Sequence, residues 1–94
     1  MTRVTLRIPT PLRSFTSGAA QLSVQAGTVR EALRFAGKEH AALTERILDE
    51  DGELRTFVNL FVGSTNVARL DGLDTSVADG DVLAILPAVA GGVR

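Results

Sequence analysis

The residues best suited to chemistry lie at the end of the chain, where an apolar run meets Pro87 and continues to Gly91-Gly92-Val93-Arg94. Glycine has no Cβ, so two successive glycines form a thread thin enough to enter a narrow channel in a partner enzyme. A carboxylate on Gly92 is inert at neutral pH, but ATP can convert it to an acyl-adenylate. The adenylate is a good acceptor for a persulfide or a thiol, and transfer of a sulfur atom to it would yield a thiocarboxylate, which is a soft nucleophile.

The element before this tail must hold it away from the rest of the protein. Pro87 cannot donate to a ladder of strand hydrogen bonds, so we expect the sheet to stop there and residues 88–94 to form a flexible arm. This divides the chain into a folded domain over residues 1–87 and a C-terminal tail over residues 88–94. The tail residues expected to enter a partner's active site are Pro87, Ala88, Val89, Ala90, Gly91 and Gly92.

The composition of the chain excludes several classes of function. The 94 residues suit one small domain, and the 45% that are hydrophobic are enough for one modest core. The nine arginines and Lys38 are scattered and the formal net charge is −1, which argues against a nucleic-acid partner. No cysteine is present to form a disulfide or act as a nucleophile. No apolar run suits a signal peptide or a membrane span, so we expect a cytoplasmic protein without a membrane partner.

The chain carries little equipment for catalysis of its own. His40 is the single histidine, and no nearby nucleophile or orienting group accompanies it, so we interpret it as a solvated surface residue. The acidic segment Asp49–Glu53 lacks the ligand spacing of a calcium loop, and the aspartates between Asp71 and Asp81 are typical of turns. We therefore predict no catalytic residue, no metal site and no bound cofactor.

Hydrophobic periodicity predicts a hairpin followed by a helix. Val4, Leu6 and Ile8 alternate with polar residues, as do Leu22 and Val24, so we expect two strands joined by a loop over residues 12–18. Thr28 and Glu31 have the spacing of a capping box at the start of a helix. The helix that follows has one apolar face, made of Val29, Ala32, Leu33 and Ala36.

The second half of the chain predicts further strands. Leu43 and Ile47 indicate a short helical segment, and residues 56–62 indicate a central strand. We expect a turn over residues 63–66, a short edge strand at most over residues 67–70, a loop over 71–81 and a last strand over 82–86. This order predicts an α+β fold, a mixed sheet with one main helix packed across it and the first and last strands parallel at its centre. That arrangement is the β-grasp, or ubiquitin-like, fold.

Three motifs resemble those of the ubiquitin-like sulfur carriers of the MoaD/ThiS family, which includes the small subunit of molybdopterin synthase and the thiamine-pathway carrier. They are Phe57-Val58-Asn59, Ala78-Asp79-Gly80-Asp81 and the stretch from Leu86 to Gly92. Residues 8–13 and 85–92 look closest to actinobacterial carriers of cysteine biosynthesis. The resemblance implies a β-grasp fold and a thiocarboxylate on Gly92. It also implies an ATP-using adenylating and sulfurating enzyme related to ubiquitin-activating enzymes, and a sulfur-accepting synthase.

The sequence departs from this family at its end, because Val93 and Arg94 follow the glycine pair. A glycine held in an amide bond has no carboxylate to adenylate. Some relatives with short extensions rely on a JAMM-type zinc metalloprotease, so we expect the same removal of Val93 and Arg94 here. Two alternatives stay open: a small subunit of a molybdopterin-synthase-like complex, and a ubiquitin-like interaction or conjugation module without sulfur chemistry.

The last strand also predicts a surface for partners. Leu83 and Ile85 share one face of it, and Val82, Ala84 and Leu86 share the other. Only one set can fill the core. We predict a partner-docking patch made of Leu86 with Phe61 or Val62, and the alternative is that these are ordinary core residues.

Overall fold

The computed structural model describes residues 2–87, so the predictions made for Ala88 to Arg94 lie outside the described residues. Within that range the strands are β1 (Arg3–Arg7), β2 (Gln21–Gln25), β3 (Val58–Val62), β4 (Thr65–Asn66) and β5 (Val82–Pro87). The α-helices are α1 (Val29–Gly37) and α2 (Ala41–Ile47). The described part of the chain also contains three short 3-10 helices: η1 (Thr10–Thr16), η2 (Val67–Arg69) and η3 (Gly72–Asp74).

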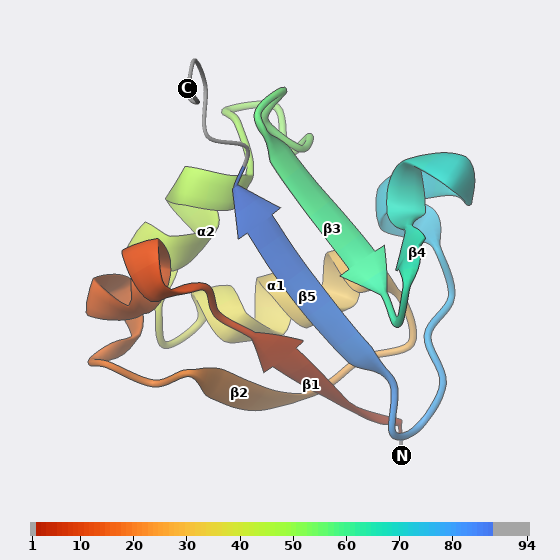
Figure 1. Ribbon diagram of the computed structural model, residues 1–94, viewed down its shortest axis with the longest axis horizontal. Helices are drawn as coiled ribbons and strands as arrows, with labels where there is room; N and C mark the ends of the chain where they lie inside the picture. Colours follow the sequence, from red (N-terminus) through yellow and green to blue (C-terminus); the bar gives the residue numbers. More distant parts are fainter. Residues whose placement is uncertain (1, 88–94) are drawn as a thin grey trace.

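The strands form one mixed sheet in the order β2-β1-β5-β3-β4. The hairpin β1–β2 and the pairs β3–β5 and β3–β4 are antiparallel, whereas β1 and β5 run parallel at the centre. Figure 1 shows β5 in the middle of the sheet with α1 crossing behind it. The predicted β-grasp fold is therefore confirmed, including the parallel pairing of the first and last strands.

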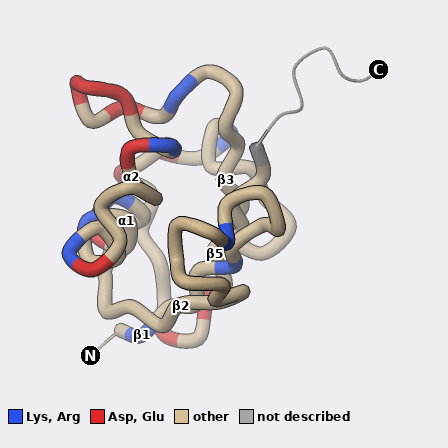
Figure 2. The backbone as a smooth tube through the Cα atoms, turned by 90° about the vertical axis from the view of Figure 1, so that its left-hand side faces the viewer, with Lys and Arg blue, Asp and Glu red and all other residues tan. Residues whose placement is uncertain are grey.

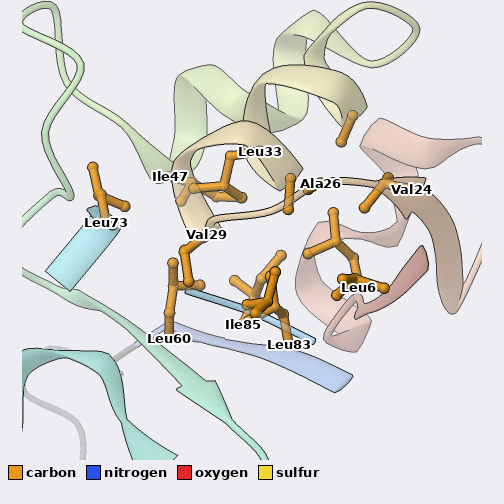
Figure 3. Close-up of a cluster of buried hydrophobic side chains, with 14 of the residues drawn as sticks. Leu6, Val24, Ala26, Val29, Leu33, Ile47, Leu60, Leu73, Leu83 and Ile85 are labelled. Carbon is orange, nitrogen blue, oxygen red and sulfur yellow. The ribbon is translucent and has the colours of Figure 1, made fainter. Parts of the chain in front are cut away.

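Helix α1 begins with the predicted side-chain cap. The Thr28 hydroxyl accepts a hydrogen bond from the Glu31 amide at 3.2 Å. The Glu31 carboxylate reaches back to the amide of Gly27 at 2.8 Å, one residue earlier than in the usual capping box. The predicted apolar face is buried against the sheet (Figure 3).

The core fills the space between one face of the sheet and the two helices. Leu83 and Ile85 point into it from β5, and Leu60 joins them from β3 (Figure 3). Leu43 and Ile47 of α2 are fully buried in the same cluster. This settles which face of β5 is buried: Leu83 and Ile85 fill the core, whereas Val82, Ala84 and Leu86 face outward.

Three local predictions were wrong. Residues 12–18 are largely the 3-10 helix η1, because Pro11 favours the first helical turn and the buried Thr16 hydroxyl bonds to the Arg13 and Ala19 carbonyls. Residues 67–70 form no strand. The Asn66 side chain accepts from the Ala68 amide at 2.9 Å and starts η2, which leaves β4 as the edge strand inside the predicted turn. The predicted loop over 71–81 contains η3.

Candidate functional site

The candidate site is the end of β5, because the predicted reactive tail follows it in the sequence. The β3–β5 ladder continues to the pair Val58–Pro87, so the last residues of β5 are held along one side. On the other side, pairing with β1 ends at Arg7–Ala84, since the chain turns away at Pro9 into η1. Central strand pairing therefore positions the point from which the tail departs.

A groove of about 270 Å³ opens where β1 leaves β5. Leu86 lines it and is 48% exposed, an unusual exposure for a leucine in a central strand. The lining residues are Arg7, Ile8, Pro9, Arg13, Ala20, Gln21, Ala84, Ile85 and Leu86. The groove offers both apolar surface and guanidinium groups beside the last residues of β5.

The outward face of the sheet carries an apolar strip along β5. Val82 is 37% exposed, and Leu86 stands on the same side of the strand. Phe61 of β3 pairs with Ala84 and is half-buried on that same face, diagonal to Leu86. We call Phe61, Val82, Ala84 and Leu86 the open-face strip.

The structure brings together only two residues of the predicted docking patch. Phe61 and Leu86 share the open face, whereas Val62 pairs with Leu83 and packs against the core. Val62 therefore lies on the opposite side of the sheet, because successive residues of a strand alternate between faces. The docking role of Phe61 and Leu86 remains a prediction.

The predicted docking patch left out two exposed apolar residues on or beside β5. Val82 has the same parity as Leu86 along β5, and that signal was already visible in the alternation. Phe57 is 50% exposed and precedes Val58, the partner of Pro87, so it lies beside the end of β5. Its place in the Phe57-Val58-Asn59 motif was the available signal.

A second groove, of about 510 Å³, lies beside the start of β3. Its lining residues are Leu12, Glu45, Arg46, Arg55, Phe57 and Val58. The Arg55 Nε donates to the Glu45 carbonyl at 2.9 Å, and the Arg46 guanidinium lies 4.8 Å from the centre of the Phe15 ring. Arg46 and Arg55 therefore lie on the β3 side of the end of β5.

Within residues 2–87 the arginines around the end of β5 are in no salt bridge, although Arg13 and Arg55 each donate from Nε to a backbone carbonyl. Over residues 2–87 the salt bridge formed is Arg30–Asp74 at 3.2 Å, which lies elsewhere. Figure 2 shows basic positions beside β5, while the longest acidic stretch lies apart from it. A partner surface with carboxylates near an apolar centre would complement this region.

The aspartates of the Ala78-Asp79-Gly80-Asp81 motif act structurally. Asp79 accepts from the Arg3 amide at 2.8 Å, and Asp81 accepts from the Ala78 amide at 2.8 Å. Gly80 has a φ of +89°, which favours glycine, and its amide donates to the Arg3 carbonyl. The motif therefore ties the turn before β5 to the start of β1, next to the parallel β1–β5 ladder.

Other candidate groups do not assemble into a site within the described residues. His40 precedes α2 and makes no side-chain cap hydrogen bond. No group of three or more His, Cys, Asp or Glu side chains between residues 2 and 87 could hold a metal ion. No helix in that range is long and apolar enough to cross a membrane.

Comparisons with known proteins agree with this geometry. Residues 6–92 match the ThiS family. The chain is 40% identical over 91 residues to the sulfur carrier protein CysO of Mycobacterium tuberculosis, covering 95% of this chain and 98% of that protein. It is similar to a chain of the Amycolatopsis orientalis BexX/CysO complex, with a TM-score of 0.88, 40% identity and coverage of 95% and 99%.

A third similarity is to the small archaeal modifier protein 1 of Methanosarcina acetivorans. The TM-score is 0.83 at 30% identity, and the match covers 98% of each chain. The predicted resemblance to ubiquitin-like sulfur carriers is thus confirmed at the level of family and fold. Because the family match spans nearly the whole sequence, this chain belongs to the ThiS family.

Proposed function

We propose that this protein is a sulfur carrier, a substrate of partner enzymes rather than a catalyst, whose Gly92 becomes a thiocarboxylate. The family match and the similarity to CysO of Mycobacterium tuberculosis support a carrier role. The structural observation that supports the proposal is the central strand β5, which bears an exposed apolar strip and ends at Pro87, three residues short of the glycine pair in the sequence.

The proposed chemistry takes place in a partner's active site. An adenylating enzyme joins the Gly92 carboxylate to AMP from ATP and releases pyrophosphate. A persulfide on the sulfurating enzyme attacks the acyl carbon and displaces AMP. A second thiol then cleaves the sulfur–sulfur bond, which leaves a thiocarboxylate on Gly92 and a disulfide on the enzyme.

Activation requires a free carboxylate on Gly92, and the sequence continues with Val93 and Arg94. We propose that a JAMM-type zinc metalloprotease hydrolyses the amide bond between Gly92 and Val93. A sulfur-accepting synthase then consumes the thiocarboxylate, in cysteine biosynthesis or in the formation of a related sulfur-containing metabolite. The similarity to a chain of a BexX/CysO complex supports the expectation of partner proteins.

We propose that the adenylating enzyme docks on the open-face strip. Leu86 and Phe61 supply apolar surface on the same face as Arg7, which pairs with Ala84 across β1 and β5. Apolar side chains surrounded by charge are typical of interface centres. Docking there would place the residues after Pro87 next to the bound enzyme.

A second candidate function is conjugation to other proteins. The similarity to small archaeal modifier protein 1 favours it. In that case the activated Gly92 carbonyl would be attacked by an amine instead of by sulfur, and the product would be an isopeptide bond.

The intact mass of the protein purified from its native cells separates these functions. A species without Val93 and Arg94, in which sulfur replaces one terminal oxygen, is expected for a sulfur carrier. Mass adducts that correspond to other proteins would favour conjugation. A uniform full-length species, unchanged after incubation with native lysate and ATP, would contradict both and leave an interaction module.

A further inference from the structure

The strand β2 forms a free edge of the sheet, on the opposite side of β1 from β5 (Figure 1). The amide of Ile8 donates to the Ala20 carbonyl at 2.8 Å, and the amide of Ala26 donates to the Thr2 carbonyl at 3.0 Å. Hydrogen-bonded pairs of an antiparallel ladder recur every second residue, so Leu22 and Val24 also bond to β1. The backbone groups of Gln21, Ser23 and Gln25 therefore point away from the sheet.

This edge lacks the usual protection against strand addition. Natural edge strands are blunted by charged side chains, proline, bulges or extreme shortness. At the opposite edge, β4 has only two residues and runs directly into η2. In contrast, β2 has five residues, pairs with β1 in unbroken register and contains neither a charge nor a proline. The outer edge of β2 therefore presents a regular row of backbone groups to which another strand could bond.

Two adjoining hollows run between β2 and helix α1, with volumes of about 240 and 250 Å³. Both are lined by Phe35, which projects from α1 and is 39% exposed. Leu22 is half-buried on the facing strand and lines the first hollow together with Ala36. A strand added to β2 would direct alternate side chains into this space, so its residues opposite Leu22 and Val24 should be apolar.

The two hollows between β2 and α1 form a continuous seam, and the charged side chains along this seam are distributed asymmetrically. Arg34 and Lys38 line the hollow at the Gln25 end, and neither is in an ion pair among the described residues. Glu31 lies there too, but its carboxylate already accepts the Gly27 amide. The other end carries Glu39 and His40. A ligand should therefore be acidic at its Gln25 end.

We propose that the seam between β2 and α1 binds an extended peptide segment of a partner protein by strand addition. The segment alternates polar and apolar residues and carries carboxylates beside Arg34 and Lys38. An antiparallel orientation, the more stable pairing, places those acids at the N-terminal end of the segment. The seam shares Gln21 with the groove at the end of β5 but includes no residue of the open-face strip, so binding here leaves that strip free.

The probe is a capped peptide in which two aspartates precede an alternating run of three threonines and two isoleucines. Titration into isotopically labelled full-length protein is followed by amide NMR signals and hydrogen exchange. The amides of Gln21, Ser23 and Gln25 should gain protection on binding. The amides of Leu22 and Val24, already bonded to β1, serve as internal controls and should change little.

Variants of the protein sharpen the test. Phe35→Ala should weaken peptide binding about tenfold, because partly exposed aromatic anchors dominate such contacts. The double substitution Arg34→Glu and Lys38→Glu should weaken it by a similar factor, more so at low salt. Phe57→Ala, which removes an exposed phenylalanine at the other end of the sheet, is the matched control and should leave the affinity unchanged.

Changes to the peptide test the strand geometry itself. N-methylation of the threonine opposite Ser23 removes a ladder donor and should abolish binding. Equal binding by that peptide, or signal changes confined to residues outside β2 and α1, would overturn the proposal. Concentration-dependent dimerisation through β2 that excludes the peptide would also overturn it and make a second copy of the chain the occupant.

Discussion

Leu86 lies directly opposite Asn59 in the antiparallel ladder of β3 and β5. This register exposes the leucine on the outward face of the sheet, one residue before the described part of the chain ends. Exposed apolar surface is unfavourable for the isolated domain, and its burial by a docked partner would stabilise the complex. The β3–β5 register therefore joins the fold to the proposed activity.

Leu86→Glu should lower kcat/KM for adenylation of the trimmed protein about tenfold, chiefly through KM, because a charge would have to be desolvated at the interface. Leu70→Glu is the matched control, since Leu70 is 47% exposed and lies outside the open-face strip. Both variants should keep the unfolding free energy within about 0.5 kcal/mol. Equal kinetics for the two variants would show that the enzyme docks elsewhere.

Gly92→Ala in protein that ends at residue 92 should abolish most adenylation, because the added methyl group obstructs a channel fitted to glycine. Pyrophosphate exchange with the native adenylating enzyme measures this step directly. Thermal unfolding provides the control and should match that of the trimmed parent protein. Normal exchange by the variant would remove Gly92 from the proposed mechanism.

Leu83→Ala should lower the free energy of unfolding by roughly 2–5 kcal/mol, since the side chain is fully buried and leaves a cavity. Val82→Ala, on the neighbouring exposed position of the same strand, should cost about 1 kcal/mol or less. Chemical denaturation of both variants measures the difference. Similar values would mean that the assignment of faces along β5 is inverted.

Thr28→Ala should destabilise the protein by about 1 kcal/mol, because the amide of Glu31 loses its cap. Thr56→Ala replaces an exposed threonine before β3 and should change stability by less than about 0.5 kcal/mol. A double-mutant cycle of Thr28→Ala with Glu31→Ala tests whether the two caps act together. An unfolding free energy for Thr28→Ala equal to that of the parent would show that α1 is stabilised by packing alone.

Local patterns were sufficient where neighbouring residues decide the structure. The Thr28 cap, the apolar face that begins at Val29 and the alternation of β1 all depend on short-range geometry, and all were predictable. Where two local signals compete, the prediction failed. The apolar residues after Asn66 favoured a strand, but the Asn66 side chain satisfies the Ala68 amide and starts a 3-10 turn instead.

The sequence by itself determined the order of elements, the placement of Leu83 and Ile85 on the same face of the last strand, and the family to which the motifs point. Only the tertiary structure decided which face of β5 is buried, because alternation defines two faces and packing against α1 selects one. It also separated Val62 from Phe61 and Leu86, and it gathered Arg13, Arg46 and Arg55 around the end of β5. Those residues are distant along the chain, so no local pattern encodes their proximity. Only the tertiary packing around β5 brings them together.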